Sequence, residues 1–249
     1  MVQTTKIDVL LMEGTTLGRN AKPTYPNEKS VEEGLLRVFR QQKNLSIIFA
    51  SPQNIDRIVS IVRAAKRANK TLIIDPYTAF VLDRLSFLSK SLPQFSWDGI
   101  RVNCWRDQIQ KLRNHGRDDF ANQCLEKRIA IGRLGSHAAD YVHLGRSSMM
   151  DLVIRKLQSK DGVPIIWSYW EGYLNKLDLK KVHDLAESVG STIEIIHTSG
   201  HASAEDLGRL VQAVRPRMLV PIHTEHPKRY EQLGMSPTLV SDGVPQEVL

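Results

Sequence analysis

The side chains best suited to chemistry lie near the end of the chain, where residues 193–226 contain four histidines, at positions 197, 201, 223 and 226. An imidazole binds metal ions and exchanges protons near neutral pH, so this group suits metal-assisted or acid–base chemistry. His197 and His201 are four residues apart, but Gly200 between them disfavours the helix that a metal-binding pair would need. By their spacing alone, these histidines could be metal ligands or satisfied structural residues.

A strand–helix–strand unit is predicted to position the histidines. The β-branched run at 193–196 predicts a strand that ends at the turn 198–200. Ser203 is predicted to cap the following helix, with Asp206 completing a capping box. Pro216 ends that helix, and a second strand follows. Open α/β sheets place their chemistry at such strand ends. The predicted buried face of the helix comprises Leu207, Leu210, Val211 and Val214.

A single carboxylate, Glu13, occupies a comparable position near the start of the chain. Residues 7–12 form a short apolar run typical of a buried strand, and Glu13 follows it directly, ahead of Gly14. Taken alone, such a residue is more often a helix cap or an ion-pair partner than a catalytic group.

The rest of the sequence predicts an α/β fold throughout. Residues 45–76 read as strand, helix and strand, and further strands are expected within 97–105, 139–145 and 163–170. Helices are expected at about 31–42, 78–89, 106–116, 149–157 and 177–188. Four aromatic residues could stack on bases or pack between two domains of the chain, and packing is favoured. They are Trp167, Tyr169, Trp170 and Tyr173.

Composition narrows the class of protein. The chain has 249 residues and a formal net charge of +7, which suits a polyanionic partner without specifying one. Cys104 and Cys124 are expected to be free thiols in a reducing cytoplasm. Neither a membrane span nor a signal peptide is predicted. The cluster Arg63, Lys66, Arg67 and Lys70 fits the solvated face of one helix, with anion binding as the alternative.

Three short motifs together resemble one family. They are LLMEGT at 10–15, HTSGHA at 197–202 and VPIHTEHP at 220–227. This combination resembles the β-CASP branch of the metallo-β-lactamase fold, the branch of ribonuclease J-like RNA-processing nucleases. Glu13 matches the family's acidic motif, His201 its SGHA histidine and His223 its PIH histidine. The separation of 223 − 201 = 22 residues is also similar to the family's spacing.

The resemblance implies a specific architecture. The fold class is α/β, with a β-CASP cap domain (a Rossmann-like parallel sheet with helices) joined to the C-terminal part of a metallo-β-lactamase αββα fold. Residues 1–27 would hold a strand and the acidic motif, and residues 28–190 the cap. Residues 191–249 would return to the metallo-β-lactamase-type, RNA-specificity segment.

The resemblance also implies a zinc site that this sequence fills only in part. Family members bind two zinc ions through an HxHxDH segment, a further histidine and an aspartate. No two histidines here lie two positions apart, so no HxHxDH is present. By resemblance, His223 would bind zinc, His201 would act at the scissile phosphate, and Glu13 would orient a histidine. Because one imidazole cannot hold a zinc ion, this chain alone is not expected to retain the two ions.

The resemblance further assigns a substrate phosphate to the loop His197, Thr198, Ser199, Gly200 and His201. Gly200 would let backbone N–H groups approach an anion, and Ser199 would add a hydroxyl. The helix that starts after Ser203 would point its positive end at the same place.

The resulting expectation is a truncated β-CASP hydrolase of zinc-dependent nuclease type, catalytically incomplete as a single chain. The alternatives are a non-catalytic RNA-binding or regulatory module, and an incomplete domain with an exposed sheet edge. The expected partners are nucleic acid, RNA rather than DNA, and a ligand-bearing N-terminal half or partner subunit. A homodimer is also expected, although it would not supply the missing ligands.

Overall fold

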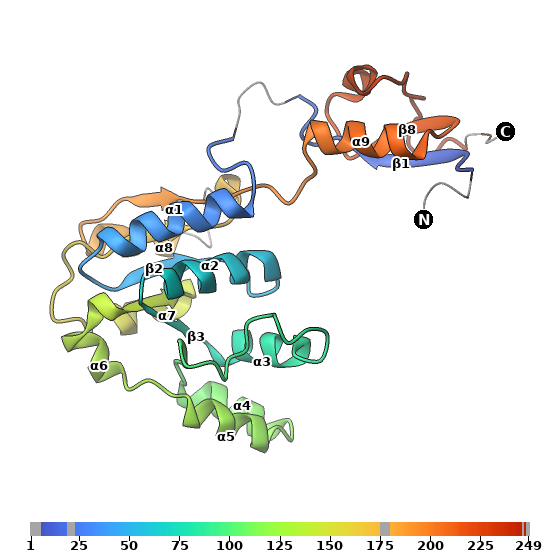
Figure 1. Ribbon diagram of the computed structural model, residues 1–249. Coiled ribbons are helices and arrows are strands. Elements are labelled where there is room, and N and C mark those ends of the chain that lie inside the picture. Colours follow the sequence, from blue (N-terminus) through green and yellow to red (C-terminus); the bar gives the residue numbers. More distant parts are fainter. Residues whose placement is uncertain (1–5, 19–22, 175–179, 246, 248–249) are drawn as a thin grey trace. The chain divides into compact units, whose positions relative to one another are not determined.

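In the computed structural model the chain folds into two compact units (Figure 1). The small unit comprises Met1–Thr24 and Ser199–Leu249, and the large unit comprises Tyr25–Thr198. The structure describes residues 6–18, 23–174, 180–245 and 247. The domain boundaries expected from the sequence, after residues 27 and 190, stay a prediction.

The large unit is built on a six-stranded sheet in the order β4-β3-β5-β2-β6-β7, and every neighbouring pair is parallel. This sheet confirms the predicted α/β class. The strands are short, and all but the edge strand β7 are mostly buried, as expected for a parallel sheet covered on both faces. Their bounds are β2 (Ser46–Phe49), β3 (Thr71–Ile74), β4 (Ile100–Val102), β5 (Tyr141–Leu144), β6 (Ile165–Trp167) and β7 (Ile193–Ile195).

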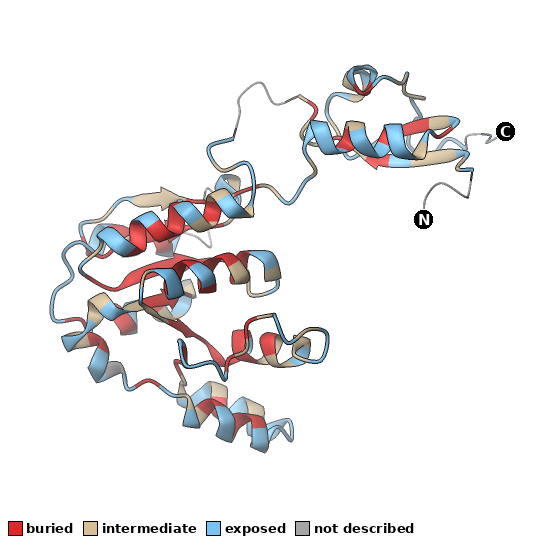
Figure 2. Cartoon of the chain, in the orientation of Figure 1, coloured by how far each residue is buried: buried red, intermediate tan, exposed pale blue. Residues whose placement is uncertain are grey.

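Helices cover both faces of this sheet and make two separate cores (Figure 2). Alternate residues of a strand serve opposite cores: Ile48 packs into the first, whereas Ile47 and Phe49 pack into the second. The first core takes α1 (Glu28–Gln41), α2 (Ile55–Arg67), α3 (Pro76–Leu85), α4 (Arg106–Asn114) and α5 (Asp118–Glu126). The second takes α6 (Ile131–Ser136), α7 (Ser147–Ile154) and α8 (Lys180–Ser188).

Two helices begin earlier than the sequence pattern predicted, because polar caps lie outside the apolar stripe. Asn27 accepts a hydrogen bond from the Ser30 N–H, so α1 starts at Glu28 rather than near residue 31. Asp75 caps α3 in the same way, with Pro76 in the first turn, so α3 starts before residue 78. No helix in the described ranges has both the length and the apolar character needed to cross a bilayer.

The small unit contains a two-stranded parallel sheet, β1 (Val9–Glu13) with β8 (Met218–Ile222), packed against α9 (Ala204–Val214). A 3₁₀ segment, η5 (Pro227–Leu233), carries the buried Tyr230, whose hydroxyl donates to the Met12 carbonyl at 2.6 Å. Gly14 is required beside it, since a Cβ at Gly14 would lie 2.4 Å from the Tyr230 hydroxyl.

The predicted buried face of α9 is wrong in part. Leu207 and Val211 are buried, but the Leu210 side chain is 42% exposed and Val214 is only partly covered. The two strands and the 3₁₀ segment offer α9 only a narrow surface. The residues at the edges of the apolar stripe of α9 therefore make little contact with it. On β1, Leu11 is likewise 62% exposed, although its neighbour Met12 is buried.

Candidate functional site

Glu13, His201 and His223 come together in the small unit. Glu13 ends β1 and His223 follows β8, and the parallel register pairs Glu13 with Ile222, so both lie at the same end of the sheet. His201 lies in the loop before α9. One ligand-capable atom from each side chain lies within 4.8 Å of the others. These are the three residues that the family motifs singled out.

The Glu13 carboxylate is anchored on several sides. It accepts N–H groups from Ala202 at 2.9 Å and from Thr15 at 3.1 Å, and it lies 3.1 Å from Nδ1 of His201. Burial raises the pKa of Glu13, but hydrogen bonds from Thr15 and Ala202 and the charge of His201 lower it by more, so the net shift is downward. The carboxylate therefore stays ionised and fixes the orientation of the His201 ring.

Thr15 fixes the second imidazole, a contact that the sequence reasoning missed. Its hydroxyl donates to the His223 carbonyl at 3.1 Å and also lies 3.1 Å from Nδ1 of His223. A hydroxyl that donates to the carbonyl can accept from Nδ1–H, which leaves Nε2 of His223 unprotonated and able to bind a metal. His223 has a φ of 50°, a conformation that non-glycine residues adopt mainly where the surrounding structure imposes it.

The donor set fits one zinc ion better than two. Two imidazoles and a carboxylate match the three protein ligands of a catalytic zinc. Two atoms bound to the same zinc at about 2.1 Å can be no more than about 4.2 Å apart, and the three ligand-capable atoms, all within 4.8 Å of one another, lie close to that limit. Within the described residues this is the one group of three such side chains, which falls short of a dinuclear site.

The predicted phosphate loop is divided between the two units. His197 and Thr198 belong to the large unit, and Ser199, Gly200 and His201 to the small unit. The Ser199 hydroxyl accepts the His201 N–H at 3.3 Å. A Cβ at Gly200 would meet no other heavy atom within 4 Å, so packing alone does not require glycine there. Such open space beside backbone N–H groups is compatible with an approaching anion.

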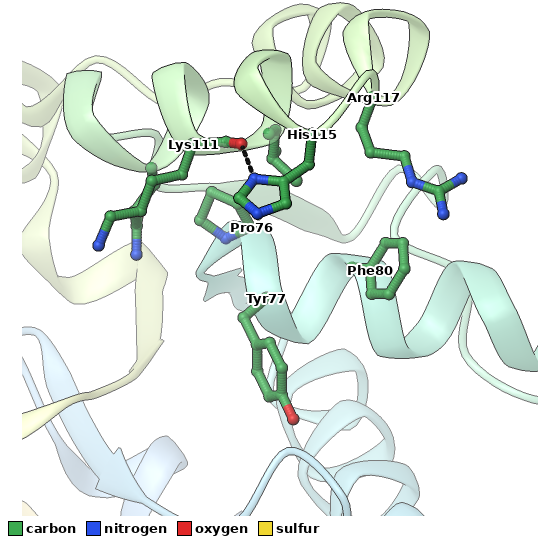
Figure 3. Close-up of a pocket in the computed structure, with 8 residues that line it drawn as sticks. Pro76, Tyr77, Phe80, Lys111, His115 and Arg117 are labelled. Atoms are coloured by element: carbon green, nitrogen blue, oxygen red, sulfur yellow. Dashed lines mark hydrogen bonds between the residues drawn. The ribbon is translucent and has the colours of Figure 1, made fainter.

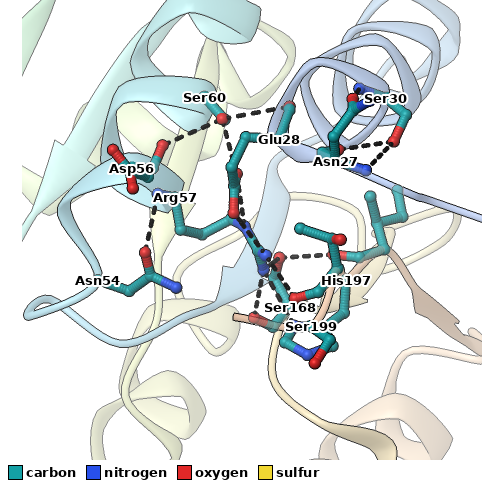
Figure 4. A network of polar contacts seen from close by, with 12 residues as sticks. Asn27, Glu28, Ser30, Asn54, Asp56, Arg57, Ser60, Ser168, His197 and Ser199 are labelled. Atoms are coloured by element: carbon teal, nitrogen blue, oxygen red, sulfur yellow. Dashed lines mark hydrogen bonds and ion pairs between the residues drawn. The ribbon is translucent and has the colours of Figure 1, made fainter. Parts of the chain in front are cut away.

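A buried arginine holds the large-unit end of this loop (Figure 4). Arg57 is 1% exposed and makes a forked contact with Glu28, with its Nε donating to Glu28 at 3.0 Å. It also donates to the carbonyl and hydroxyl of Ser168, both at 2.7 Å. Its remaining contacts are the His197 ring at 3.2 Å and the Thr198 carbonyl at 3.3 Å. Arg57 thus fixes both the start of α1 and the segment that leads into the loop.

Other chemically capable residues have structural surroundings. His143 is buried in β5 between the Asn103 side chain and the Leu144 carbonyl, as expected for a structural histidine. Burial raises the pKa of Cys104 to about 11 and that of Cys124 to about 12, so both stay thiols, and neither is in a disulfide. His226 is exposed.

The aromatic group divides into two pairs. Trp167 is buried in the second core and lies 4.9 Å from Tyr169, ring centre to ring centre, so this pair packs within the large unit. Trp170 is 58% exposed and makes an edge-to-face contact with Tyr173. Packing of these rings between the two domains stays a prediction.

Comparison with known proteins supports the resemblance. Residues 188–232 match the family model described as the Zn-dependent metallo-hydrolase RNA specificity domain. Over 225 residues, 86% of its length, the chain is 22% identical to ribonuclease J2 of Bacillus subtilis (strain 168). The chain is a distant relative of ribonuclease J2. The predicted kinship with ribonuclease J-like proteins is thereby confirmed.

A solved structure extends the likeness in fold. A protein of unknown function from Enterococcus faecalis V583 matches 98% of this chain with a TM-score of 0.65 and 21% identity. The chain spans 52% of that protein and 37% of ribonuclease J2, so it covers about half or less of the relatives it matches. The ribonuclease J2 kinship therefore concerns only part of a longer architecture.

Proposed function

We propose that this chain forms part of a zinc-dependent ribonuclease of the β-CASP type. The large unit would be the cap domain, and the small unit would be the C-terminal part of a metallo-β-lactamase fold. The convergence of Glu13, His201 and His223 in one site carries the proposal, because three separate motifs meet there. The match of residues 188–232 to an RNA specificity domain supports RNA rather than DNA as substrate.

Each residue has a role that follows from its contacts. His223 presents an unprotonated Nε2 and would bind zinc directly. Glu13 holds Nδ1 of His201, so Nε2 of His201 faces away from the carboxylate and is available to a scissile phosphate or its leaving oxygen. Zinc, when bound, would activate water and stabilise phosphate charge. The residues present would orient the phosphate and hold the transferred proton.

The chain by itself is proposed to be catalytically incomplete. A dinuclear centre needs the ligands that the family's HxHxDH segment supplies, and this sequence contains no HxHxDH. The remaining ligands would have to come from a segment or subunit that carries that motif. A second copy of the chain would bring the same three side chains again.

A second candidate is a non-catalytic RNA-binding or regulatory module. The shortage of metal ligands and the net charge of +7 favour it. It predicts RNA affinity without turnover under any metal condition.

The decisive experiment joins an HxHxDH-bearing segment to the chain, in cis or in trans, and assays a labelled RNA with zinc. Hydrolysis that requires both the added segment and zinc supports the nuclease proposal. An added segment that binds two zinc ions per complex without any cleavage contradicts it and favours the regulatory module. A chain that retains two tightly bound zinc ions by itself would contradict the proposed incompleteness.

A further inference from the structure

A cavity of about 480 Å³ lies in the large unit between α3 and α4, separate in sequence and unit from the histidine site (Figure 3). Its volume is within the range of small-molecule sites, roughly 300–1,000 Å³. It opens near the carboxyl ends of β3 and β4, since α3 follows β3 and α4 follows β4. Its lining consists of Pro76, Tyr77, Phe80, Gln108, Lys111, Leu112, His115 and Arg117.

Two flat rings in this cavity are held in place by their neighbours. Tyr77 is 43% exposed, yet its hydroxyl accepts from Gln53 at 2.9 Å and the Arg146 guanidinium lies 5.0 Å from its ring centre. Nδ1 of His115 donates to the Lys111 carbonyl at 2.8 Å, as Figure 3 shows. Rings fixed before binding lose little conformational freedom when a flat ligand packs against them.

The charges of the lining favour an anionic group on that ligand. Lys111 and Arg117 both contribute cations, and none of the described residues that line the cavity carries a carboxylate. The Arg117 guanidinium lies 6.0 Å from the Phe80 ring centre, which keeps it beside the cavity. Asp83, Asp118 and Asp119 line a neighbouring hollow, which shares Phe80 and Arg117 with this cavity, so Lys111 is the cation that belongs to this cavity alone.

Gln108, which lines the cavity, has a buried polar atom without a partner. Its Oε1 is shielded from solvent and makes no hydrogen bond within the described residues, while its amide nitrogen lies 3.7 Å from the Met149 sulfur. A buried carbonyl oxygen without a donor is uncommon and costs stability. A rotation of the Gln108 side chain would turn this oxygen toward the cavity, where an N–H group of any RNA base could donate to it.

We propose that this cavity binds one unpaired nucleotide of an RNA strand. The base packs against Tyr77 and His115 with an N–H directed to Gln108, and Lys111 and Arg117 receive the adjoining phosphates. Flat rings combined with cations are the usual elements of single-strand recognition. The inference rests on the proposed RNA substrate and adds to it a holding site on the large unit, whereas the histidine site belongs to the small unit.

The test measures equilibrium binding of a short fluorescein-labelled oligouridylate to the intact chain by anisotropy, without added metal. Tyr77→Ala is expected to weaken binding roughly tenfold or more, the usual effect of losing one stacked base, while Tyr77→Phe retains the affinity. Lys111→Gln is expected to weaken binding and to lower the slope of log K against log salt by about 0.7.

Arg113→Gln is the matched control, because Arg113 lies on α4 with Lys111 but does not line the cavity. It makes the same change of charge and should leave the affinity close to that of the unmodified chain. Thermal unfolding followed by circular dichroism verifies that each variant is folded. UMP should compete with the oligouridylate, whereas inorganic phosphate alone should not.

Three results would overturn the inference. One is equal RNA affinity in all variants, another is binding of UMP without binding of RNA, and the third is no RNA binding by the unmodified chain. None of these measurements involves zinc or cleavage. A failure of the proposed nucleotide binding is therefore distinguishable from a failure of the nuclease proposal. RNA cleavage by the extended protein carrying Tyr77→Ala would separate the two directly.

Discussion

At the scale of single residues, the Glu13–His201 pair determines which ring nitrogen of His201 can act. Glu13 is held by two backbone N–H groups and contacts Nδ1 of His201, so Nε2 is the ring nitrogen that the proposed mechanism leaves for substrate. A carboxylate that orients an imidazole in this way also stabilises the ring when it is protonated. The pair is therefore suited to passing a proton to a leaving oxygen.

In the zinc-loaded, extended protein, His201→Ala is expected to lower kcat by roughly 10²–10⁴-fold, the usual contribution of general acid–base catalysis. Glu13→Gln should cost less, roughly 10–100-fold, since it only loosens the orientation of His201. His183→Ala, which removes an exposed histidine on α8, is the control and should retain full activity. The measurement is steady-state cleavage of a labelled RNA, and an unchanged rate in His201→Ala would remove His201 from the chemistry.

The burial of His143 leads to a second prediction at this scale, on how the free energy of unfolding depends on pH. Burial lowers its pKa from 6.5 to about 4, although its bond to the Leu144 carbonyl and the charge of Asp75 oppose the shift. The unfolded chain therefore takes up a proton below about pH 6.5, whereas the folded chain does so only below about pH 4. The free energy of unfolding should fall by about 2 kcal/mol between pH 7.5 and pH 5.

Urea denaturation at pH 7.5 and pH 5 measures this loss. His143→Gln should abolish most of the difference between the two pH values, whatever its effect on absolute stability. His183→Gln should leave the difference intact, because His183 is exposed. A wild-type chain equally stable at both pH values would show that His143 is not the buried neutral ring that the structure describes.

At the scale of elements, Arg57 joins four parts of the large unit. From α2 it reaches Glu28 at the start of α1, Ser168 after β6, and residues 197–198 after β7. Removing one partner of a buried ion pair leaves an uncompensated charge, which costs about 3–5 kcal/mol. Because Glu28 is partly exposed, Glu28→Gln should fall at the lower end, at about 3 kcal/mol.

Glu33→Gln on the same helix is the control for this prediction. Glu33 pairs with Arg67 at the surface, where ion pairs contribute little, so its loss should not change the urea midpoint. The measurement compares the urea midpoints of Glu28→Gln and Glu33→Gln. Equal midpoints would mean that the Arg57 network does not stabilise the fold.

The elements show how far the sequence alone could lead. Apolar runs located β2 and β3 to within two residues, because strands buried on both faces are continuously hydrophobic. The position of β5 between β3 and β2 could not be predicted, since strand order leaves no trace in the local sequence.

At the candidate site, too, the sequence identified some residues and only the fold revealed others. The strand-end rule and the family motifs brought out Glu13, His201 and His223. The contact of Thr15 with a ring 208 residues away could not be read from either, although Thr15 lies within the LLMEGT motif. Arg57 has the local sequence of an ordinary helix arginine, and only the fold reveals its burial.

At the scale of the whole molecule, the small unit leaves apolar surface uncovered in the described part of the chain. Leu11 on β1 and Ile222 on β8 are 62% and 44% exposed, on a sheet of only two strands, and Leu210 on α9 is 42% exposed. A two-stranded sheet is only marginally stable without further packing, and its unpaired strand edges can pair with other chains. If the proposed ligand-bearing segment exists, part of this surface would lie against it.

Adjacent residues on β1 provide the test. In the isolated chain, Met12→Ala should destabilise by about 2–5 kcal/mol, because Met12 is buried in the small core. Leu11→Ser should change stability by less than about 0.5 kcal/mol and should reduce self-association in sedimentation runs. In the protein extended with the HxHxDH segment, Leu11→Ser should become clearly destabilising, since Leu11 would then be covered. If Leu11→Ser has the same small effect in both proteins, the segment does not pack on this strand.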